Sequence, residues 1–424
     1  MYSSVRDRPA PGAPETPSPE EPVAPGLGRN VPLLGVTSLL TDISSESVNA
    51  VLPLYLTTVL GYSAQAFGLF DGVYQGMSAL LRIVGGLVAD RRQRHKEVAG
   101  AGYALSAACK VGLLATTASV PTAGILFLDR TGKGVRTAPR DALISLSSRP
   151  ETMGLAFGIH RALDTVGAFI GPILAFLLLW FTPKAYDSVF VVSLCFAVLG
   201  VGVLVCFVQN PPRERLKPAR APAFTRDSTR RLMGNRSFRR ITVAGALLGL
   251  VTISDAFVYL VYQHRTKMTP TTFPLLFVGT SLAYLLLAVP LGRLSDRIGR
   301  APVFLAGNAV LIVCYVVLRG SGSGFLTIAV ILGLLGTYYA ATDGVLMALA
   351  SEVIPAELRS SGLAWLTTVT TLAKALASFI FGACWAWVGP NGAVSWFVAG
   401  MAVAVPIAVL VLFHPSTRRE VPAR

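Results

Sequence analysis

The ten residues GGLVADRRQR at 85–94 return in altered form as LGRLSDRIGR at 291–300. Each copy places a glycine four residues before an aspartate that is followed by arginines, and each follows the second long apolar run of its half. A second pair, RPETMGLAF at 149–157 and IPAELRSSGLAW at 354–365, precedes the fifth apolar run of each half. This repetition predicts two halves of like architecture, related by an axis along a membrane normal.

The composition is that of a membrane protein. Of the 424 residues, 53% are hydrophobic and only 14% are charged, with a mean hydropathy of +0.60. A soluble fold could not bury so much apolar surface, whereas a bilayer accepts one helix for every ~20 apolar residues. We therefore expect an all-α integral membrane protein with about twelve spans in two pseudo-symmetric six-helix bundles. The predicted spans are 31–59, 66–89, 97–118, 122–146, 152–180, 187–208, 241–263, 272–293, 301–318, 325–350, 361–388 and 392–413.

The polar segments predict the domain boundaries and the orientation. Residues 1–29 hold seven prolines and no apolar core, which indicates a disordered tail. The linker at 209–240 carries ten Lys/Arg against Glu214 and Asp227, so the positive-inside rule places it in the cytoplasm. We expect a multi-pass protein of the cell (inner) membrane with both termini cytoplasmic. The predicted units are the tail 1–29, bundles 30–208 and 241–414, the linker 209–240 and a tail 415–424.

Several other classes are disfavoured. The net charge of +15 lies between apolar spans and not on a soluble basic face, so nucleic acid is not an expected partner. The five cysteines lack metal-binding spacing, and GKGV at 132–135 lacks the spacing and hydroxyl of a phosphate-binding loop. We expect no enzyme activity, no metal and no cofactor beyond a proton gradient. The expected partners are a small-molecule substrate, protons and the lipid bilayer, and the expected state is a monomer.

The repeated loop resembles the Gly-x3-Asp-Arg-x-Gly-Arg motif of major facilitator superfamily (MFS) transporters, and the resemblance extends over essentially everything after residue 30. The first copy departs at Gln93, where glycine is usual. A helix-end aspartate beside arginines predicts a conformational latch between the halves. The alternative is that these charges only set the membrane orientation. The latch residues are Gly86, Asp90, Arg91 and Arg94 in the first copy and Gly292, Asp296, Arg297, Gly299 and Arg300 in the second.

Two further motifs add to the resemblance. The pattern Arg-x3-Gly at Arg130, followed by Gly134, is linked in the family to proton transfer. The fifth span resembles the antiporter pattern Gly-x8-Gly-x3-Gly-Pro-x2-Gly, with Ala175 replacing the last glycine. It implies export in exchange for protons, although plain packing glycines are the alternative. The matching residues are Gly158, Gly167, Gly171 and Pro172. A narrower resemblance, through TDISSE at 41–46 and GKGVRTAPRDALI at 132–144, is to bacterial and archaeal permeases of unassigned substrate.

Polar residues at helical spacing predict a central cavity. Charges deep in a membrane span need partners or water, so stripes of them should face the interior. Asp42, Glu46 and Asn49 form such a stripe in the first span, and Asp71 and Gln75 form another in the second. A third stripe in the fourth span holds Asp129, Lys133, Arg136 and Arg140, with Asp129 and Lys133 as a favourable i,i+4 pair.

Depth along the helices predicts the partners. At about 1.5 Å per residue, Arg130 reaches the level of Glu46, so we expect Arg130 to modulate the proton affinity of Glu46 or Asp42. A permanent ion pair that only joins helices is the alternative. Asp255 and Lys374 match in depth, which favours a neutralising pair over substrate binding. The predicted proton-coupling residues are Asp42, Glu46, Arg130, Asp164 and Asp255. The predicted cavity residues are Asn49, Asp71, Gln75, Lys133, Arg136, Tyr339 and Lys374.

The fifth span carries His160, Arg161 and Asp164, and these predict either a local structural network or a proton relay. Lys110, midway through the third span, has no predicted partner. The leading functional hypothesis is proton-coupled efflux of a drug or metabolite by alternating access. The surplus of Lys and Arg in the fourth span favours an alternative, the uptake or exchange of an anionic metabolite. A transport-inactive sensor or scaffold of the same fold is the alternative from another class.

Overall fold

The computed structural model describes residues 28–92, 94–148, 152–210, 226–355 and 358–413, with backbone alone at 78–80, 82–92, 226–229 and 359–360. In this part of the chain there are helices and no strand. The first half contains six long helices, and the first of them ends in a π-helical turn, η1 (Tyr55–Val59). They are α1 (Asn30–Leu54), α2 (Ala64–Arg92), α3 (His95–Ala115), α4 (Ser119–Leu146), α5 (Met153–Phe181) and α6 (Tyr186–Phe207).

The second half begins with a short helix, α7 (Arg226–Gly234), which lies within the predicted linker. Leu232 of α7 is buried with Ile354 and Leu366 of the second bundle. The longer helices are α8 (Arg236–Leu250), α9 (Asp255–Thr266), α10 (Pro274–Ile298), α11 (Arg300–Arg319), α12 (Phe325–Val353) and α13 (Arg359–Phe413).

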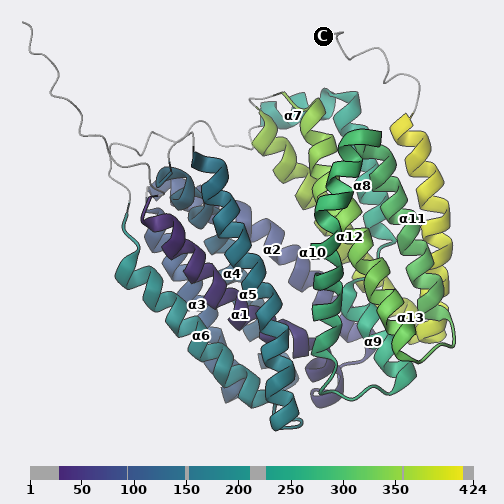
Figure 1. Cartoon of the computed structure of the whole chain (residues 1–424), viewed down its shortest axis with the longest axis horizontal. Coiled ribbons are helices and arrows are strands. Elements are labelled where there is room, and N and C mark those ends of the chain that lie inside the picture. Colours follow the sequence, from purple (N-terminus) through teal and green to yellow (C-terminus); the bar gives the residue numbers. More distant parts are fainter. Residues whose placement is uncertain (1–27, 93, 149–151, 211–225, 356–357, 414–424) are drawn as a thin grey trace, which may run out of the picture.

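The helices account for the twelve predicted spans. Eight stretches of the described residues are long and apolar enough to cross a membrane, and one of them, inside α13, is long enough for two spans. α1, α2 and α4 are not among the eight. α1 and α4 carry polar stripes, which lower their mean hydropathy, and the side chains of α2 are described only in part. The arrangement is therefore an all-α membrane fold of two six-helix bundles (Figure 1).

The seventh span is broken, which differs from the continuous helix predicted over 241–263. α8 ends at Leu250 and α9 begins at Asp255. A broken helix leaves backbone groups that lipid cannot satisfy. Here the Ile253 backbone N–H donates to Tyr315 Oη at 2.7 Å. The break places Asp255 at the start of α9, inside the bundle.

The last two spans are two helices that meet at a sharp kink at Gly389 and together carry the label α13. This residue has φ 75°, a left-handed conformation that favours glycine, and Pro390 follows it. The kink lies between the predicted spans 361–388 and 392–413 and confirms that boundary.

The two halves contact each other at one end of the molecule and diverge towards the end that carries α7 (Figure 1). At the contacting end α2 packs against α13, and α5 packs against α10. Phe67 of α2, Phe257 of α9 and Phe381 of α13 form an aromatic cluster there, with centroids 5.0 and 4.7 Å apart. These rings close that end of the space between the bundles.

Glycines of the fifth-span motif bring α5 against α1. A Cβ added at Gly167 would lie 2.6 Å from Leu39 O and 3.2 Å from Asp42 Cβ. One added at Gly171 would lie 2.8 Å from Ser47 N and 3.0 Å from Glu46 Cβ. Only glycine permits this approach. The motif therefore holds α5 directly beside the two carboxyl-bearing residues of α1.

We expect Gly167→Leu to lower the free energy of unfolding by about 1–3 kcal/mol, because the larger side chain must push α1 away. Gly158→Leu is the matched control, since a Cβ at Gly158 meets no atom within 4 Å. Thermal unfolding of the purified variants, followed by a thiol-reactive dye, measures the difference. Equal losses of stability in both variants would contradict the close-approach role of Gly167.

Candidate functional site

A cavity of about 640 Å³ lies between the bundles and is lined from both halves. The first half contributes α1, α2 and α4, and the second half contributes α8 to α13 and the break between α8 and α9. Its charged lining residues are Glu46, Asp71, Arg130, Asp255, Asp343 and Lys374. Asn49, Gln75 and Tyr339 also line it, as predicted, together with aromatic side chains such as Phe70 and Phe304.

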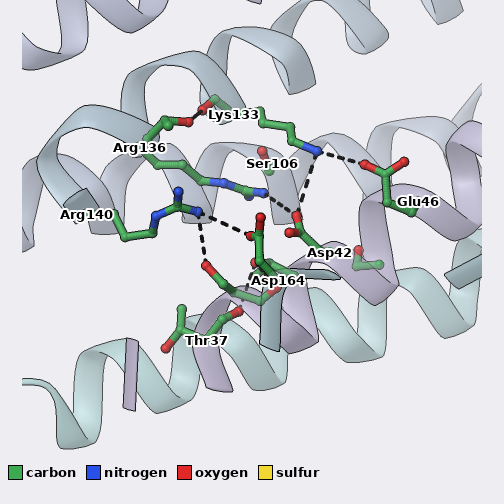
Figure 2. Close-up of polar contacts among 12 residues, drawn as sticks. Thr37, Asp42, Glu46, Ser106, Lys133, Arg136, Arg140 and Asp164 are labelled. Carbon is green, nitrogen blue, oxygen red and sulfur yellow. Dashed lines mark hydrogen bonds and ion pairs between the residues drawn. The ribbon is translucent and has the colours of Figure 1, made fainter. Parts of the chain in front are cut away.

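The Lys133 ammonium of α4 lies between two carboxylates of α1 (Figure 2). Its Nζ is 2.8 Å from Glu46 Oε1 and 3.7 Å from Asp42 Oδ1. Glu46 also faces the cavity, so one end of this cluster is open to a substrate. Lys133, whose side chain is 30% exposed, lies behind Glu46 at the edge of this cavity, and its predicted role in the lining stays a prediction.

Asp42 is buried within a wider cluster of charges from three helices. Arg136 Nη2 of α4 lies 3.7 Å from Asp42 Oδ1, and the carboxyl of Asp164 on α5 lies within hydrogen-bonding reach of the Asp42 carboxyl. Arg140 in turn lies 3.7 Å from Asp164 (Figure 2). Arg136 is only 3% exposed and lies in this cluster, not at the predicted cavity wall.

Arg130 does not contact Glu46 directly, which differs from the partner expected from helix depth. Its Nη2 donates to Asn49 Oδ1 at 2.8 Å, and its guanidinium lies over the Tyr74 ring, 3.8 Å from the centroid. Asn49 Nδ2 donates to Glu46 Oε2 at 3.0 Å. Arg130 therefore reaches Glu46 through one intervening amide. Lys133 lies one turn further along α4 than Arg130, a shift of about 4.5 Å along the helix axis. Because this shift is smaller than the length of the Lys133 or the Arg130 side chain, both cations can reach the level of Glu46.

The partner of Asp129 lies on another helix, whereas the sequence predicts Lys133 of the same helix. Lys110 Nζ of α3 lies 3.0 Å from Asp129 Oδ1, in place of the expected i,i+4 pair with Lys133. The reason is the crossing of α3 and α4, where a Cβ at Gly132 would lie 2.6 Å from Gly102 O. The close crossing brings Lys110, only 1% exposed, opposite Asp129 and away from the cavity. This gives Lys110 the partner that the sequence did not predict.

The second half holds its charges differently. Tyr339 Oη donates to Asp255 Oδ1 at 2.6 Å, and Lys374 Nζ lies 5.9 Å from the ring centroids of Tyr338 and Tyr339. No direct ion pair joins Asp255 and Lys374 among the described residues, so the predicted neutralising pair is replaced by a hydrogen bond. Asp343 was not predicted, although it lies one helical turn after Tyr339 and faces the same cavity.

The predicted network in α5 is present in part. Arg161 Nη1 lies 3.5 Å from Asp164 Oδ2, as the i,i+3 spacing indicated. His160 is buried, and neither ring nitrogen has a hydrogen-bond partner within the described part of the chain. The same part contains no cluster of His, Cys, Asp or Glu that could hold a metal ion.

The comparisons with known proteins decide the family. The model of the Major Facilitator Superfamily matches residues 34–267 and 251–424. The chain belongs to the Major Facilitator Superfamily. Because this family consists of transporters, the chain is a multi-pass membrane transporter of the MFS type.

Relatives with similar sequences carry transporter names. The uncharacterized MFS-type transporter MJ1317 of Methanocaldococcus jannaschii is 29% identical over 402 residues, covering 91% of this chain and 95% of that protein. The multidrug resistance protein MdtH of Salmonella typhi is 25% identical over 275 residues, covering 62% of this chain and 63% of that protein.

Solved structures share the fold. The crystal structure of the nucleoside transporter NupG has a TM-score of 0.76 at 13% identity and covers 91% of this chain and 99% of that one. A bacterial homologue of the human lysosomal transporter Spinster, in an inward-facing and occupied conformation, has a TM-score of 0.71 at 12% identity, covering 93% and 98%. Both are similar to this chain in fold, and at this level of identity their substrates do not indicate the substrate of this chain.

The second copy of the MFS loop motif forms its ion pairs within one bundle. Arg300 Nη1 lies 2.8 Å from Glu352 Oε1 of α12, and Arg300 Nη2 lies 3.6 Å from Asp296 Oδ1. Gly299, at φ 100°, makes the tight turn between α10 and α11. In this conformation Arg300 joins helices of the same half, so the latch between the halves stays a prediction.

The structure describes the remaining latch residues in less detail. Gly292 has open space around it, and Arg94 is exposed immediately before α3. Gly86, Asp90 and Arg91 belong to α2, and their side chains lie outside the described part. Arg297 lies in the last turn of α10.

We expect Lys110→Met to lower the free energy of unfolding by about 3–5 kcal/mol, because it leaves the Asp129 carboxylate buried without a counter-charge. The double variant Lys110→Met/Asp129→Asn removes both charges and should recover most of that loss. Chemical or thermal denaturation of the purified proteins measures both effects. The buried-pair assignment fails if the double variant is no more stable than Lys110→Met.

Proposed function

We propose that this transporter is a proton-coupled efflux antiporter, in which the carboxyls of Asp42, Glu46 and Asp164 exchange a proton against substrate. The observation that carries the proposal is the position of Lys133, shared between Asp42 and Glu46 at the edge of the cavity. A cation shared by two carboxylates moves towards one of them when the other takes a proton. Protonation there changes the contacts between α1 and α4, the helices that bear these groups.

Charge balance makes the cluster sensitive to a single proton. With every group ionised, the four carboxylates of the cluster balance its four cations, namely Asp42, Glu46, Asp141 and Asp164 against Lys133, Arg136, Arg140 and Arg161. One added proton leaves a net positive charge among groups taken out of water. At an effective dielectric constant near 20, a unit charge pair at about 4 Å contributes about 4 kcal/mol. The free-energy gap between two conformations of a protein is a few kcal/mol, so one proton is enough to shift the populations.

The contact between the carboxyls of Asp42 and Asp164 supports the same proposal. Two carboxyls that face each other are stable when they share one proton, since two adjacent negative charges repel. Gly167 brings α5 to the level of Asp42 and so makes this contact possible. The antiporter motif thus has a physical role at the proposed proton site.

The cavity favours export of a neutral or cationic small molecule over exchange of an anionic metabolite. Its described lining has four carboxyl side chains, Glu46, Asp71, Asp255 and Asp343, against the cations Arg130 and Lys374. The surplus of basic residues that suggested an anionic substrate lies in the ion-pair cluster instead. The multidrug resistance name of MdtH, a relative over part of the chain, also favours efflux.

We further propose that the protein works as a monomer in the cell membrane, needs no cofactor beyond the proton gradient and is not an enzyme. The charge pattern supports cytoplasmic termini and a cytoplasmic linker at 209–240, between bundles 30–208 and 241–414. With that orientation the end carrying α7 is cytoplasmic, and the halves diverge towards the cytoplasm.

Single cysteines at Ser228 and Ser416, in a background without the five native cysteines, should resist an impermeant thiol reagent in intact cells and react after permeabilisation. Both positions are expected to lie inside. Lys184→Cys, at the opposite end of the molecule, is the control and should react in intact cells. Rapid labelling at Ser228 from outside would reverse the proposed orientation.

In proteoliposomes, Glu46→Gln and Asp42→Asn should each abolish substrate movement driven by a pH gradient, because a fixed-neutral side chain no longer links proton binding to conformation. Substrate binding should survive in at least Asp42→Asn, which does not line the cavity. The assay records proton uptake and substrate flux over a range of pH, with Asp187→Asn, an exposed position in the first turn of α6, as an acidic control. Unchanged gradient-driven transport in the two cluster variants would exclude these carboxyls as the proton site.

A further inference from the structure

Asp71 stands apart from the ion-pair cluster, at the interface between the two halves. Its side chain projects from α2 towards α13 and is only 7% exposed. Ser378 Oγ of α13 donates to Asp71 Oδ2, and Gln75 Nε2 donates to the same oxygen at 2.9 Å. Asp71 also lines the cavity. It is therefore a buried carboxyl that contacts both the closed interface and the central space.

The backbones of α2 and α13 pack closely on the interface side of Asp71. A Cβ at Gly72 would lie 2.5 Å from Ala375 O, and one at Gly68 would lie 2.7 Å from Ser378 O. On the opposite helix, a Cβ at Gly382 would lie 2.6 Å from Ala64 O. The backbones of α2 and α13 are thus in direct contact on both sides of Asp71 along its helix. Separation of the halves at this end must break this contact and hydrate Asp71.

Asp71 has no counter-charge within 4 Å in the described part of the chain. The groups that face it are the hydroxyls of Ser378 and Ser254, the Gln75 amide, and more distantly Arg130 of α4 and Asp255 of α9. Arg130 is already held by Asn49 and Tyr74. Burial of an unpaired carboxylate is far more costly than burial of a neutral carboxyl that keeps its hydrogen bonds.

We propose that Asp71 is a second proton site, which must take up a proton for the α2–α13 interface to close. When this end is open, the ionised carboxylate is hydrated. A proton from the water on that side converts it to the neutral acid, and Ser378 and Gln75 then hydrogen-bond to the buried carboxyl. After the cavity opens at the α7 end, the proton passes from Asp71 to water in the cavity. The inference deepens the proposed proton coupling by making closure of one gate depend on protonation.

The closing step can be followed directly as a distance. Spin labels at Ser63 and Asn391, both exposed residues at the contacting end, report the separation of the halves in a cysteine-free protein in lipid nanodiscs. In the parent protein the ratio of open to closed populations should rise about tenfold per pH unit over the steepest range, as expected for one proton released on opening. Asp71→Asn should stay closed throughout, because its neutral amide is buried at any pH.

Two variants separate the proton from the hydrogen bond. Ser378→Ala keeps the carboxyl and should retain the pH-dependent opening, whereas Asp71→Thr, a second neutral replacement, should lose it as Asp71→Asn does. Asp187→Asn, an exposed carboxyl in the first turn of α6 and away from the α2–α13 interface, should behave like the parent. A parent protein whose distances ignore pH, or an Asp71→Asn variant that opens at alkaline pH like the parent, would overturn the proposal.

The distance measurement is independent of transport. One outcome is that the parent protein shows no gradient-driven exchange, while the distance between the spin labels still changes with pH and this change is lost in Asp71→Asn. The proposed antiport is then wrong and the gate proposal stands. If exchange depends on Asp42 and Glu46 while Asp71→Asn leaves the distances unchanged from the parent, the gate proposal is wrong and the antiport stands.

Discussion

The fold depends on one constraint, which is that a bilayer does not accept an unpaired charge. A lone charge at its centre costs at least about 2.5–3.5 kcal/mol, and the first bundle carries many. The chain meets the constraint by pairing across helices: Lys133 with Asp42 and Glu46, and Lys110 with Asp129. These pairs fix which faces of α1, α3 and α4 meet. The same charges that make α1 and α4 poor membrane spans by composition therefore determine how they assemble.

Pairing of this kind requires close backbones, and glycines supply them. Gly132 brings α3 to α4 beside the Lys110–Asp129 pair, and Gly167 and Gly171 bring α5 to α1 beside Asp42 and Glu46. Van der Waals contact drives helix association in lipid, since apolar burial gives little preference for protein over acyl chains. Glycine contact and ion pairing thus occur at the same levels of the bundle. A larger side chain at either place would disturb packing and charge balance together.

The repeated motifs and apolar runs were enough to predict the two bundles and almost every span, because both signals are local in sequence. The break between α8 and α9 was missed because its stability comes from Tyr315, a residue some sixty positions away. Helix depth brought Arg130 to the level of Glu46 but did not reveal Lys133 as the direct partner, since one turn is shorter than the reach of that side chain. Asp129 was assigned to the wrong partner because the rotation of α3 about its axis cannot be read from one sequence. Asp343 could have been found from its helical spacing after Tyr339.

The two halves differ in how they stabilise charge, and this asymmetry bears on mechanism. The first bundle uses direct ion pairs between helices, and separating them would leave unpaired charges. Its helices should therefore move together unless a proton compensates the charge. The second bundle holds Asp255 with a tyrosine hydroxyl and Lys374 near aromatic rings, which are weaker and less demanding contacts. Its seventh span is already broken at 251–254, and α13 kinks at Gly389. Since α9 and α13 also contribute the aromatic rings that close one end, the broken and kinked elements of the second bundle are those that must shift when that end opens. Under the proposed proton coupling, the first bundle supplies the proton-sensitive charges, and the second supplies most of the movement.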